Sequence, residues 1–404
     1  MASEKDVLIQ NAQLRHRPHG NLVALSIKAG RIADIDANPN QEHRQTIIDA
    51  SGGLVTESFV NPHLHLDKVY TLDRLDELAL QSYQGAGMGK AMNAIELASR
   101  VKSEYDESWI LPNVRKALEL AAKNGNTHLR AFADVDSKAK LIGVRALLKA
   151  KKEFEGRVSV QVVAFAQDGI VREPGAEGLL REAMSLGADV VGGIPWIEYT
   201  ETDAQRHVNA VFSIAKEFGK PVSMLVDDAG DPGLRTLEMM AVRAIEQGWQ
   251  GRALAHHARA MALYPKPYLQ KVIALLKQSQ MYVVTDPQTG PLHARVKEML
   301  EEGALVCLGQ DDISDAYYPY GQNNMLEVAF LASHLLWMTS AEEIDILYDM
   351  ITTEAAKAIG LQDFGLRVGT PANLVILDVP TVRDALRYHR APKYVISHGA
   401  LFEN

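Results

Sequence analysis

The chain has 404 residues with a formal net charge of −9 at pH 7, and 47% of the residues are hydrophobic while 23% are charged. Such a composition provides a large buried core and excludes an intrinsically disordered chain. The charged residues are distributed along the chain without a cluster of lysine or arginine, which argues against nucleic acid as a partner.

Both ends of the chain have the residue pattern of antiparallel strands. Short strand-like runs lie at 7–9, 23–27, 31–35, 372–377, 394–397 and 398–402. Alternation of apolar and polar residues, broken by glycine, predicts strands joined by turns. We therefore expect residues 1–56 and 366–404 to form one small β-sandwich domain together.

The middle of the chain, residues 57–365, alternates apolar strand-like runs with longer amphipathic stretches. Candidate strands lie at 54–60, 127–133, 159–165, 189–194, 221–226, 253–257, 281–284 and 305–308. Strands that alternate with helices predict an α/β fold with a parallel sheet, and this number of units predicts a (β/α)8 TIM-like barrel. Between Asp67 and about Trp109, the glycine-rich segment 85–90 is either a lid or an ordinary surface loop.

The sequence carries no targeting or membrane signal. No basic leader precedes an apolar segment, and no run of about 18 apolar residues occurs. The single cysteine, Cys307, lies in an apolar run and is typical of a small buried hydrophobe rather than of a disulfide. We expect a cytoplasmic protein with no membrane partner, and the sequence leaves homo-oligomer formation open.

A His-x-His pair, His63 and His65, follows the first apolar strand of the barrel region. Side chains two residues apart on a strand point to the same face, so the two imidazoles can bind one cation. Taken alone, such a pair is about as often a chance feature of a core or a surface as it is a metal site. Its place at the C-terminal end of a barrel strand, where barrel enzymes carry their chemistry, favours a metal site.

The eighth candidate strand delivers Asp311 and Asp312 at its end. An aspartate there can bind an ion, accept a proton from a metal-activated water, or do both. The structural alternative is a helix N-cap or a turn, where aspartate is common. With the His-x-His pair on the other side of the same barrel seam, the pattern favours a functional Asp311.

The sixth candidate strand ends in His256 and His257. Neighbouring side chains on a strand point in opposite directions, so we expect His257 to face the barrel interior and His256 to face the helices. His257 could bind the ion or assist attack on the substrate, whereas a lone core histidine is the structural alternative.

Several ordered segments resemble the cytosine deaminase branch of the amidohydrolase superfamily. They are VNPHLHLD at 60–67, VVAFAQDG at 162–169, GADVVGGIP at 187–195, GQDDISD at 309–315 and YPYGQNNML at 318–326. The similarity runs nearly end to end and includes N-isopropylammelide isopropylaminohydrolase, which removes an alkylamine from a triazine ring. It implies a metal-dependent barrel hydrolase that acts on C–N bonds.

The same resemblance implies roles for individual residues. It implies that His63, His65 and Asp311 bind the metal and that His257 assists the attack on the substrate. It also implies that Gln167 contacts the substrate ring and that Asp312 and Tyr317 line the pocket. These roles agree with the interpretation of the strand ends from the residues themselves.

The fifth strand departs from the family pattern, because Leu225 stands where the family has a metal-binding histidine. Asp228 falls at the position of the acid/base glutamate of cytosine deaminase, and Asp227 at that of a histidine in the triazine enzyme. Other histidines of these relatives are replaced by Phe132, Trp196 and Gln310. The pocket is therefore less basic and more apolar than in the family.

Three accounts of Leu225 are open. The site is rebuilt with Asp227 or His257 as a ligand, it is weakened and partly occupied, or the metal is lost and the protein binds a small molecule without turnover. We favour the rebuilt site, because the other parts that a hydrolytic site needs are retained.

The sequence thus predicts a hydrolase with one divalent ion, zinc before iron or manganese, that attacks a C–N bond of a small, cyclic nitrogen compound. The predicted catalytic residues are Asp311, His257, Asp228 and Asp227, and the predicted substrate contacts are Gln167, Asp312, Tyr317 and Trp196. The alternative is a non-catalytic small-molecule binder on the same fold.

Overall fold

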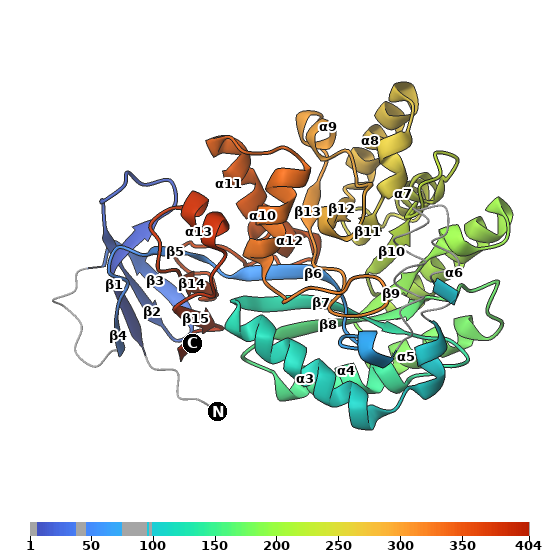
Figure 1. Ribbon diagram of the computed structural model, residues 1–404, viewed down its shortest axis with the longest axis horizontal. Helices are drawn as coiled ribbons and strands as arrows, with labels where there is room; N and C mark the ends of the chain where they lie inside the picture. Colours follow the sequence, from blue (N-terminus) through green and yellow to red (C-terminus); the bar gives the residue numbers. More distant parts are fainter. Residues whose placement is uncertain (1–5, 38–45, 75–94, 97–98, 404) are drawn as a thin grey trace.

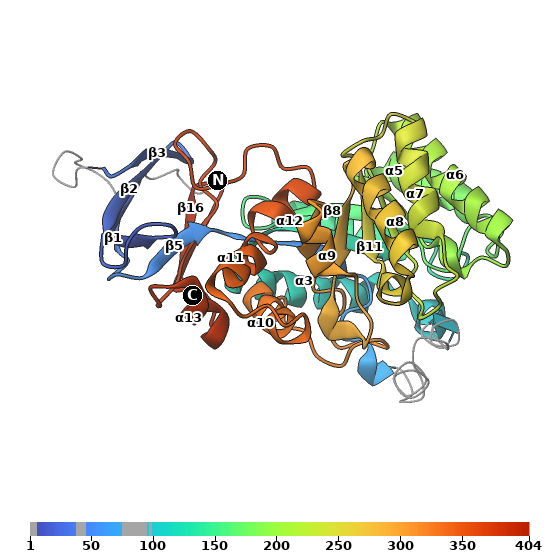
Figure 2. The ribbon, with the colours of Figure 1, turned by 90° about the horizontal axis from the view of Figure 1, so that it is seen from above.

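Figure 1 shows the computed structural model, which describes residues 6–37, 46–74, 95–96 and 99–403. A strand-rich part lies beside a larger part in which helices surround strands, and Figure 2 shows both from above. The glycine-rich segment 85–90, interpreted as a lid or a surface loop, lies outside the described residues. Among the described helices, none is long and apolar enough to cross a membrane.

An 8-stranded parallel sheet forms the barrel, and each strand pairs with the next one along the chain. The strands are β6 (Phe59–His65), β7 (Asn126–Asp134), β8 (Ser159–Ala166), β9 (Val190–Gly193), β10 (Val222–Val226), β11 (Ala253–His257), β12 (Tyr282–Thr285) and β13 (Val306–Leu308). A parallel bridge between Leu64 and Asp311 joins the first strand to the end of the last. This arrangement confirms the predicted α/β class and barrel architecture.

Helices connect these strands and cover the outside of the barrel (Figure 1). They are α3 (Glu107–Lys123), α4 (Ile142–Glu153), α5 (Ala176–Leu186), α6 (Glu201–Phe218), α7 (Thr236–Glu246), α8 (Lys266–Ser279), α9 (Val296–Glu301), α10 (Met325–Leu335), α11 (Ala341–Asp349) and α12 (Thr353–Ala358). The sequence fixes their ends locally. The Thr200 side chain caps α6 by accepting a hydrogen bond from the Asp203 backbone N–H, and Gly219 ends the helix at a φ of 67°.

Short 3-10 helices lie at several strand ends and in the connections between elements. They are η1 (Leu72–Arg74), η3 (Ser99–Glu104), η4 (Pro195–Ile197), η5 (Arg259–Leu263) and η6 (Pro287–Thr289). Three of them, η4, η5 and η6, begin within two residues of the end of β9, β11 and β12, and so they place side chains directly above the barrel.

Both chain ends build the second sheet, as the sequence predicts. Its strands are β1 (Val7–Leu14), β2 (Val23–Lys28), β3 (Arg31–Ile35), β4 (Thr46–Asp49), β5 (Leu54–Glu57), β14 (Leu374–Ile376), β15 (Tyr394–Ser397) and β16 (Ala400–Glu403), with α13 (Val382–Tyr388) between β14 and β15. The ends meet where β5 pairs antiparallel with β14. A separate apolar cluster fills this part, including Val7, Ile9 and Ile396. The domain limits of 1–56 with 366–404 and 57–365 stay a prediction.

The predicted first barrel strand, 54–60, is wrong in its limits. The run is divided between two sheets, because β5 pairs with β1 and β14 whereas β6 pairs with β7. Ser58 lies between the two strands, and its backbone N–H bonds to the Asn373 carbonyl of the small sheet. The first barrel strand therefore begins at Phe59 and runs through both histidines.

Candidate active site

His63 and His65 occupy the end of β6, as the alternation of strand side chains requires. Both are buried, and their ring centroids lie 5.2 Å apart. Burial, followed by the neighbouring His257, lowers the pKa of His63 well below its usual value. The imidazole is therefore neutral, which is the form that binds metal ions.

Asp311 faces this pair from the other side of the barrel seam. Its backbone N–H donates to the His63 carbonyl and its carbonyl accepts from the His65 N–H, both at 2.9 Å. Its Oδ1 lies 3.5 Å from His63 Nε2 and 3.7 Å from His65 Nε2. Asp311 lies three residues after the end of β13 and has a left-handed backbone with a φ of 70°.

Burial raises the pKa of Asp311 well above its usual value, and the neighbouring carboxylates of Asp312 and Asp286 raise it further. A buried carboxylate in such surroundings gains most from a nearby cation. His63 leaves both ring nitrogens, and His65 leaves Nδ1, without a hydrogen-bond partner among the described residues. The donor set and these unpartnered nitrogens fit a divalent metal ion.

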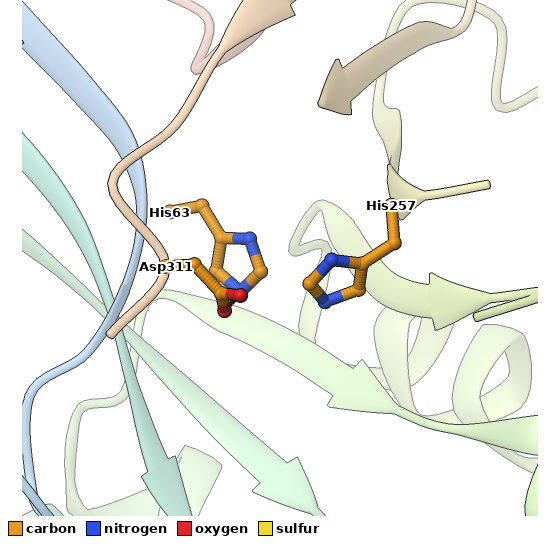
Figure 3. Close-up of side chains that lie close together, drawn as sticks. All are labelled: His63, His257 and Asp311. Atoms are coloured by element: carbon orange, nitrogen blue, oxygen red, sulfur yellow. Dashed lines mark ion pairs between the residues drawn. The ribbon is translucent and has the colours of Figure 1, made fainter. Parts of the chain in front are cut away.

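His257 completes the group in Figure 3, where its ring points toward His63 and Asp311. Ligand atoms of His63, His257 and Asp311 all lie within 4.8 Å of one another, and so do those of His65, Asp311 and Asp312. The two sets share Asp311. One end of the barrel therefore gathers three imidazoles and the Asp312 carboxylate around Asp311.

The expectation that His256 faces the helices is wrong. Its ring centroid lies 4.4 Å from that of His63 and 5.0 Å from that of Phe132, inside the barrel, and its Nε2 is 2.9 Å from Ser223 Oγ. Both histidines face inward because His257 adopts a left-handed φ of 67°. That backbone turn breaks the alternation on which the expectation rested.

The structure separates the two carboxylates that follow β10. Asp228 lines the pocket, and its Oδ2 lies 3.8 Å from His257 Nε2. Asp227, with a φ of 46°, points away from the pocket to the start of α7. There its carboxylate accepts hydrogen bonds from Thr236 N and Leu237 N, where the amides at a helix start need partners. Asp227 is therefore not brought to the other candidate residues.

The predicted substrate contacts line one cavity. Its polar lining includes Gln167, Asp312, Tyr317, Asp228, His65 and His257, and its apolar lining is Ile95, Ile194, Trp196 and Leu225. Leu225 packs in one cluster with Phe132, Ile194 and Trp196. Three of the residues that replace histidines in the sequence, Phe132, Trp196 and Leu225, thus belong to one apolar cluster, and Trp196 and Leu225 give the cavity an apolar wall.

The orientation of the Gln167 amide follows from its neighbour. Lys68 Nζ, which can only donate, lies 3.3 Å from Gln167 Oε1. Lys68 is held in place by Asp134, at 2.8 Å. The Gln167 oxygen is therefore used inside the protein, and its NH2 group is the part left to donate to a bound molecule.

Sequence reasoning missed Asp286 and Arg259. Asp286 follows β12 directly and accepts a hydrogen bond from His257 Nδ1 at 2.9 Å. Arg259 begins η5 and donates to Asp286 Oδ2, also at 2.9 Å. The position of Asp286 at a strand end was a usable signal, because the same rule identified Asp311. No local pattern marks Arg259.

Comparison with known proteins agrees with this geometry. A model described as "Amidohydrolase family" matches residues 46–402. N-isopropylammelide isopropyl amidohydrolase of Pseudomonas sp. (strain ADP) is 30% identical over 381 residues, which cover 94% of this chain and 92% of that protein.

Solved structures are similar over nearly the whole chain. That of 5-methylcytosine deaminase from Klebsiella pneumoniae, liganded with phosphonocytosine, has a TM-score of 0.88 and 31% identity and covers 98% of each chain. That of N-isopropylammelide isopropylaminohydrolase from Burkholderia multivorans has a TM-score of 0.86 and 24% identity, again over 98% of each chain.

Proposed function

The chain belongs to the amidohydrolase family and is a hydrolase of C–N bonds other than peptide bonds. We propose that it removes ammonia or an amine from a small cyclic nitrogen compound. The observation that carries the proposal is the convergence of His63, His65, His257 and Asp311 at the C-terminal end of the barrel. The same barrel end holds the chemistry of barrel enzymes in general.

We propose one divalent ion, zinc before iron or manganese, with His63, His65, His257 and Asp311 as the residues that hold it. Three imidazoles and one carboxylate form a donor set that suits all three metals. His257 takes the place left open by Leu225, because Asp227 is engaged at α7. When bound, such an ion lowers the pKa of a water to about 7 and polarises the bond under attack.

Asp311 and Asp228 are the residues proposed to move protons. Burial raises the pKa of Asp228, so this carboxyl holds a proton more readily than an exposed aspartate does. Its Oδ2 faces the cavity beside His257 and can deliver that proton to a leaving nitrogen. Asp286 accepts from His257 Nδ1 and so leaves His257 Nε2 directed at the cavity.

The cavity supports an uncharged, planar substrate of small size. The Gln167 NH2 group can donate to a ring nitrogen or carbonyl, and the wall of Leu225, Ile194 and Trp196 suits an apolar face or substituent. The relatives named above act on 5-methylcytosine and N-isopropylammelide. We propose a nitrogen heterocycle of this size class, without choosing between deamination and removal of an alkylamine.

Metal analysis and a substrate panel test the proposal together. Purified protein should contain about one equivalent of zinc, iron or manganese, and it should release ammonia or amine from at least one aminopyrimidine or aminotriazine. Chelation should abolish that release and added metal should restore it. A protein without metal, and without activity after metal is added, would be the non-catalytic binder instead.

We predict that the double variant His63→Ala/His65→Ala retains less than half of the wild-type metal content. Removal of two of the four proposed ligands leaves too few donors for a stable site. Elemental analysis of the purified protein measures the change. His207→Ala is the control, because His207 is equally buried but bonds to Glu198 away from this group. Unchanged metal in the double variant would place the ion elsewhere.

We predict that Leu225→His raises zinc affinity and lowers native activity by about tenfold in kcat/KM. The new imidazole adds a neutral ligand near His257, while the apolar wall loses a side chain that packs with Trp196. Competition with a chromophoric chelator measures the affinity. Leu225→Asn has nearly the same shape without an imidazole, so it should lose activity and gain no affinity. Equal zinc affinity in wild type and Leu225→His would show that the side chain at position 225 does not face the ion.

A further inference from the structure

Arg259 lies in the centre of the acidic side of the cavity, although it is almost completely buried at 2% exposure. The left-handed backbone of His257 and Ala258, with φ values of 67° and 50°, turns the chain at the end of β11. This turn returns the Arg259 side chain over the barrel. The guanidinium group there reaches carboxylates from three different strand ends.

Asp228 and Asp311 each turn one oxygen toward Arg259 and the other toward the candidate site, whereas Asp286 contacts both Arg259 and His257. Asp228 Oδ1 forms an ion pair with Arg259 Nη1 at 2.9 Å, while its Oδ2 faces His257 Nε2. Asp286 Oδ2 accepts from Arg259 Nη2 at 2.9 Å, and both Asp286 oxygens lie close to His257 Nδ1, Oδ1 at 2.9 Å and Oδ2 at 3.0 Å. Asp311 Oδ2 lies 3.7 Å from Nη2, while its Oδ1 faces the two imidazoles of β6.

Thr289 contacts the same oxygens of Asp286 and Asp311 that face Arg259. Its hydroxyl oxygen lies 3.1 Å from Asp311 Oδ2, and it also contacts Asp286 Oδ2 and Arg259 Nη2. Thr289 comes from η6, which follows β12, so residues from β10, β11, β12 and β13 meet at one guanidinium group. A planar fork of fixed geometry can span several carboxylates at once, whereas the point charge of an ammonium group cannot.

We propose that Arg259 is the positioning residue of this active site: its guanidinium fork holds one oxygen of Asp228 and of Asp311, which directs their other oxygens to proton transfer or to the ion, and it fixes Asp286 against His257 Nδ1. The inference rests on the proposed function. Neither the strand-end pattern nor the family resemblance identifies Arg259. The planar geometry of its guanidinium group, and not its positive charge alone, is the property that matters.

The test compares Arg259→Ala, Arg259→Lys and the wild type, with Arg181→Ala as a matched control, because Arg181 bridges Glu177 and Glu217 on the surface. Zinc affinity is measured by chelator competition, and kcat and KM are measured on the substrate that the wild type hydrolyses. The recovery of kcat on addition of millimolar methylguanidinium is measured last. The last readout distinguishes positioning from a merely structural role.

Arg259→Ala should bind zinc about 10- to 100-fold more weakly and lose about 10²-fold in kcat, with KM changed far less. Methylguanidinium should restore part of the lost kcat in Arg259→Ala and in no other variant. Arg259→Lys should remain impaired. Wild-type zinc affinity and kcat in Arg259→Ala would overturn the proposal, and so would full activity in Arg259→Lys.

Two further comparisons cover the cases in which Arg259→Ala does not fold or no substrate is found. If circular dichroism shows that Arg259→Ala does not fold, Arg259→Lys and Thr289→Val carry the test, because both disturb the fork contacts at nearly constant volume; normal kcat and zinc affinity in both would overturn it. If the wild type hydrolyses no compound of the panel, the proposed function fails, whereas the zinc affinities still test Arg259.

Discussion

Replacing Asp311 with asparagine should lower kcat by about 10³-fold or more, because the amide neither accepts a proton nor binds a cation as a carboxylate does. Asp311 Oδ1 is the oxygen nearest to His63 Nε2 and His65 Nε2, at 3.5 and 3.7 Å, so the substitution acts where the ligand atoms meet. Steady-state kinetics on the substrate identified in the panel measures the loss.

The fold should survive this substitution. Because burial raises the pKa of Asp311, the folded state favours the protonated carboxyl; this stabilisation is present at low pH and is lost as the pH rises through the raised value. Burial and the neighbouring carboxylates outweigh the attraction of Arg259 for this carboxylate, so a neutral asparagine in the metal-free protein replaces an ionised form that the folded state disfavours. Its unfolding temperature should not fall below that of metal-free wild type.

A conservative change at an exposed carboxylate provides the control for Asp311. Asp378 forms a surface ion pair with Arg390, and its side chain is 50% exposed, so Asp378→Asn should keep normal kcat. If Asp311→Asn retained more than a tenth of wild-type kcat, Asp311 would be a structural residue, and the proton would have to pass through Asp228 alone.

The second large effect is expected for Asp286→Asn, with a loss of about 10²-fold in kcat and about 10- to 100-fold in zinc affinity. Asp286 accepts from His257 Nδ1, which fixes the ring and leaves Nε2 for the cavity. An asparagine can instead present its NH2 group to Nδ1 and so favour the tautomer that carries its proton on Nε2. That tautomer cannot bind a metal ion through Nε2.

Glu198→Gln is the matched control, because Glu198 Oε1 contacts His207 Nδ1 at 2.7 Å in an equally buried carboxylate–imidazole pair outside the metal-binding group. It should lower stability without changing zinc affinity. Chelator competition and thermal unfolding of both variants separate the two effects. Equal zinc affinity in Asp286→Asn and the wild type would show that His257 is not a ligand.

The strand-end rule explains why the central residues could be predicted from sequence. His63, His65 and Asp311 follow apolar runs whose parallel arrangement brings their ends together, and the family resemblance adds Gln167 and the pocket residues. The limits of the first barrel strand could not be found in this way. The run 54–60 contains no glycine or proline that would mark a break, and the pairing of Ser58 with Asn373 divides it between two sheets.

The errors in side-chain direction share one physical cause. Alternation predicts facing only while the backbone stays extended, yet Asp227 and His257 have φ values of 46° and 67°. The first turn carries Asp227 away to α7, and the second leaves His256 and His257 both inside the barrel. Neither residue is a glycine, so no residue type in the sequence marks these turns.

The bridge between Leu64 and Asp311 also sets an order of events during synthesis of the chain. Domains form as the chain emerges from the ribosome with its N-terminal part first, so both β6 histidines are exposed long before Asp311 exists. Contacts between residues so distant in the chain form slowly, because a very long loop must close. The proposed donor set is therefore complete only once the end of the last strand has docked against the first, and a nascent chain should bind the proposed ion more weakly than the folded protein.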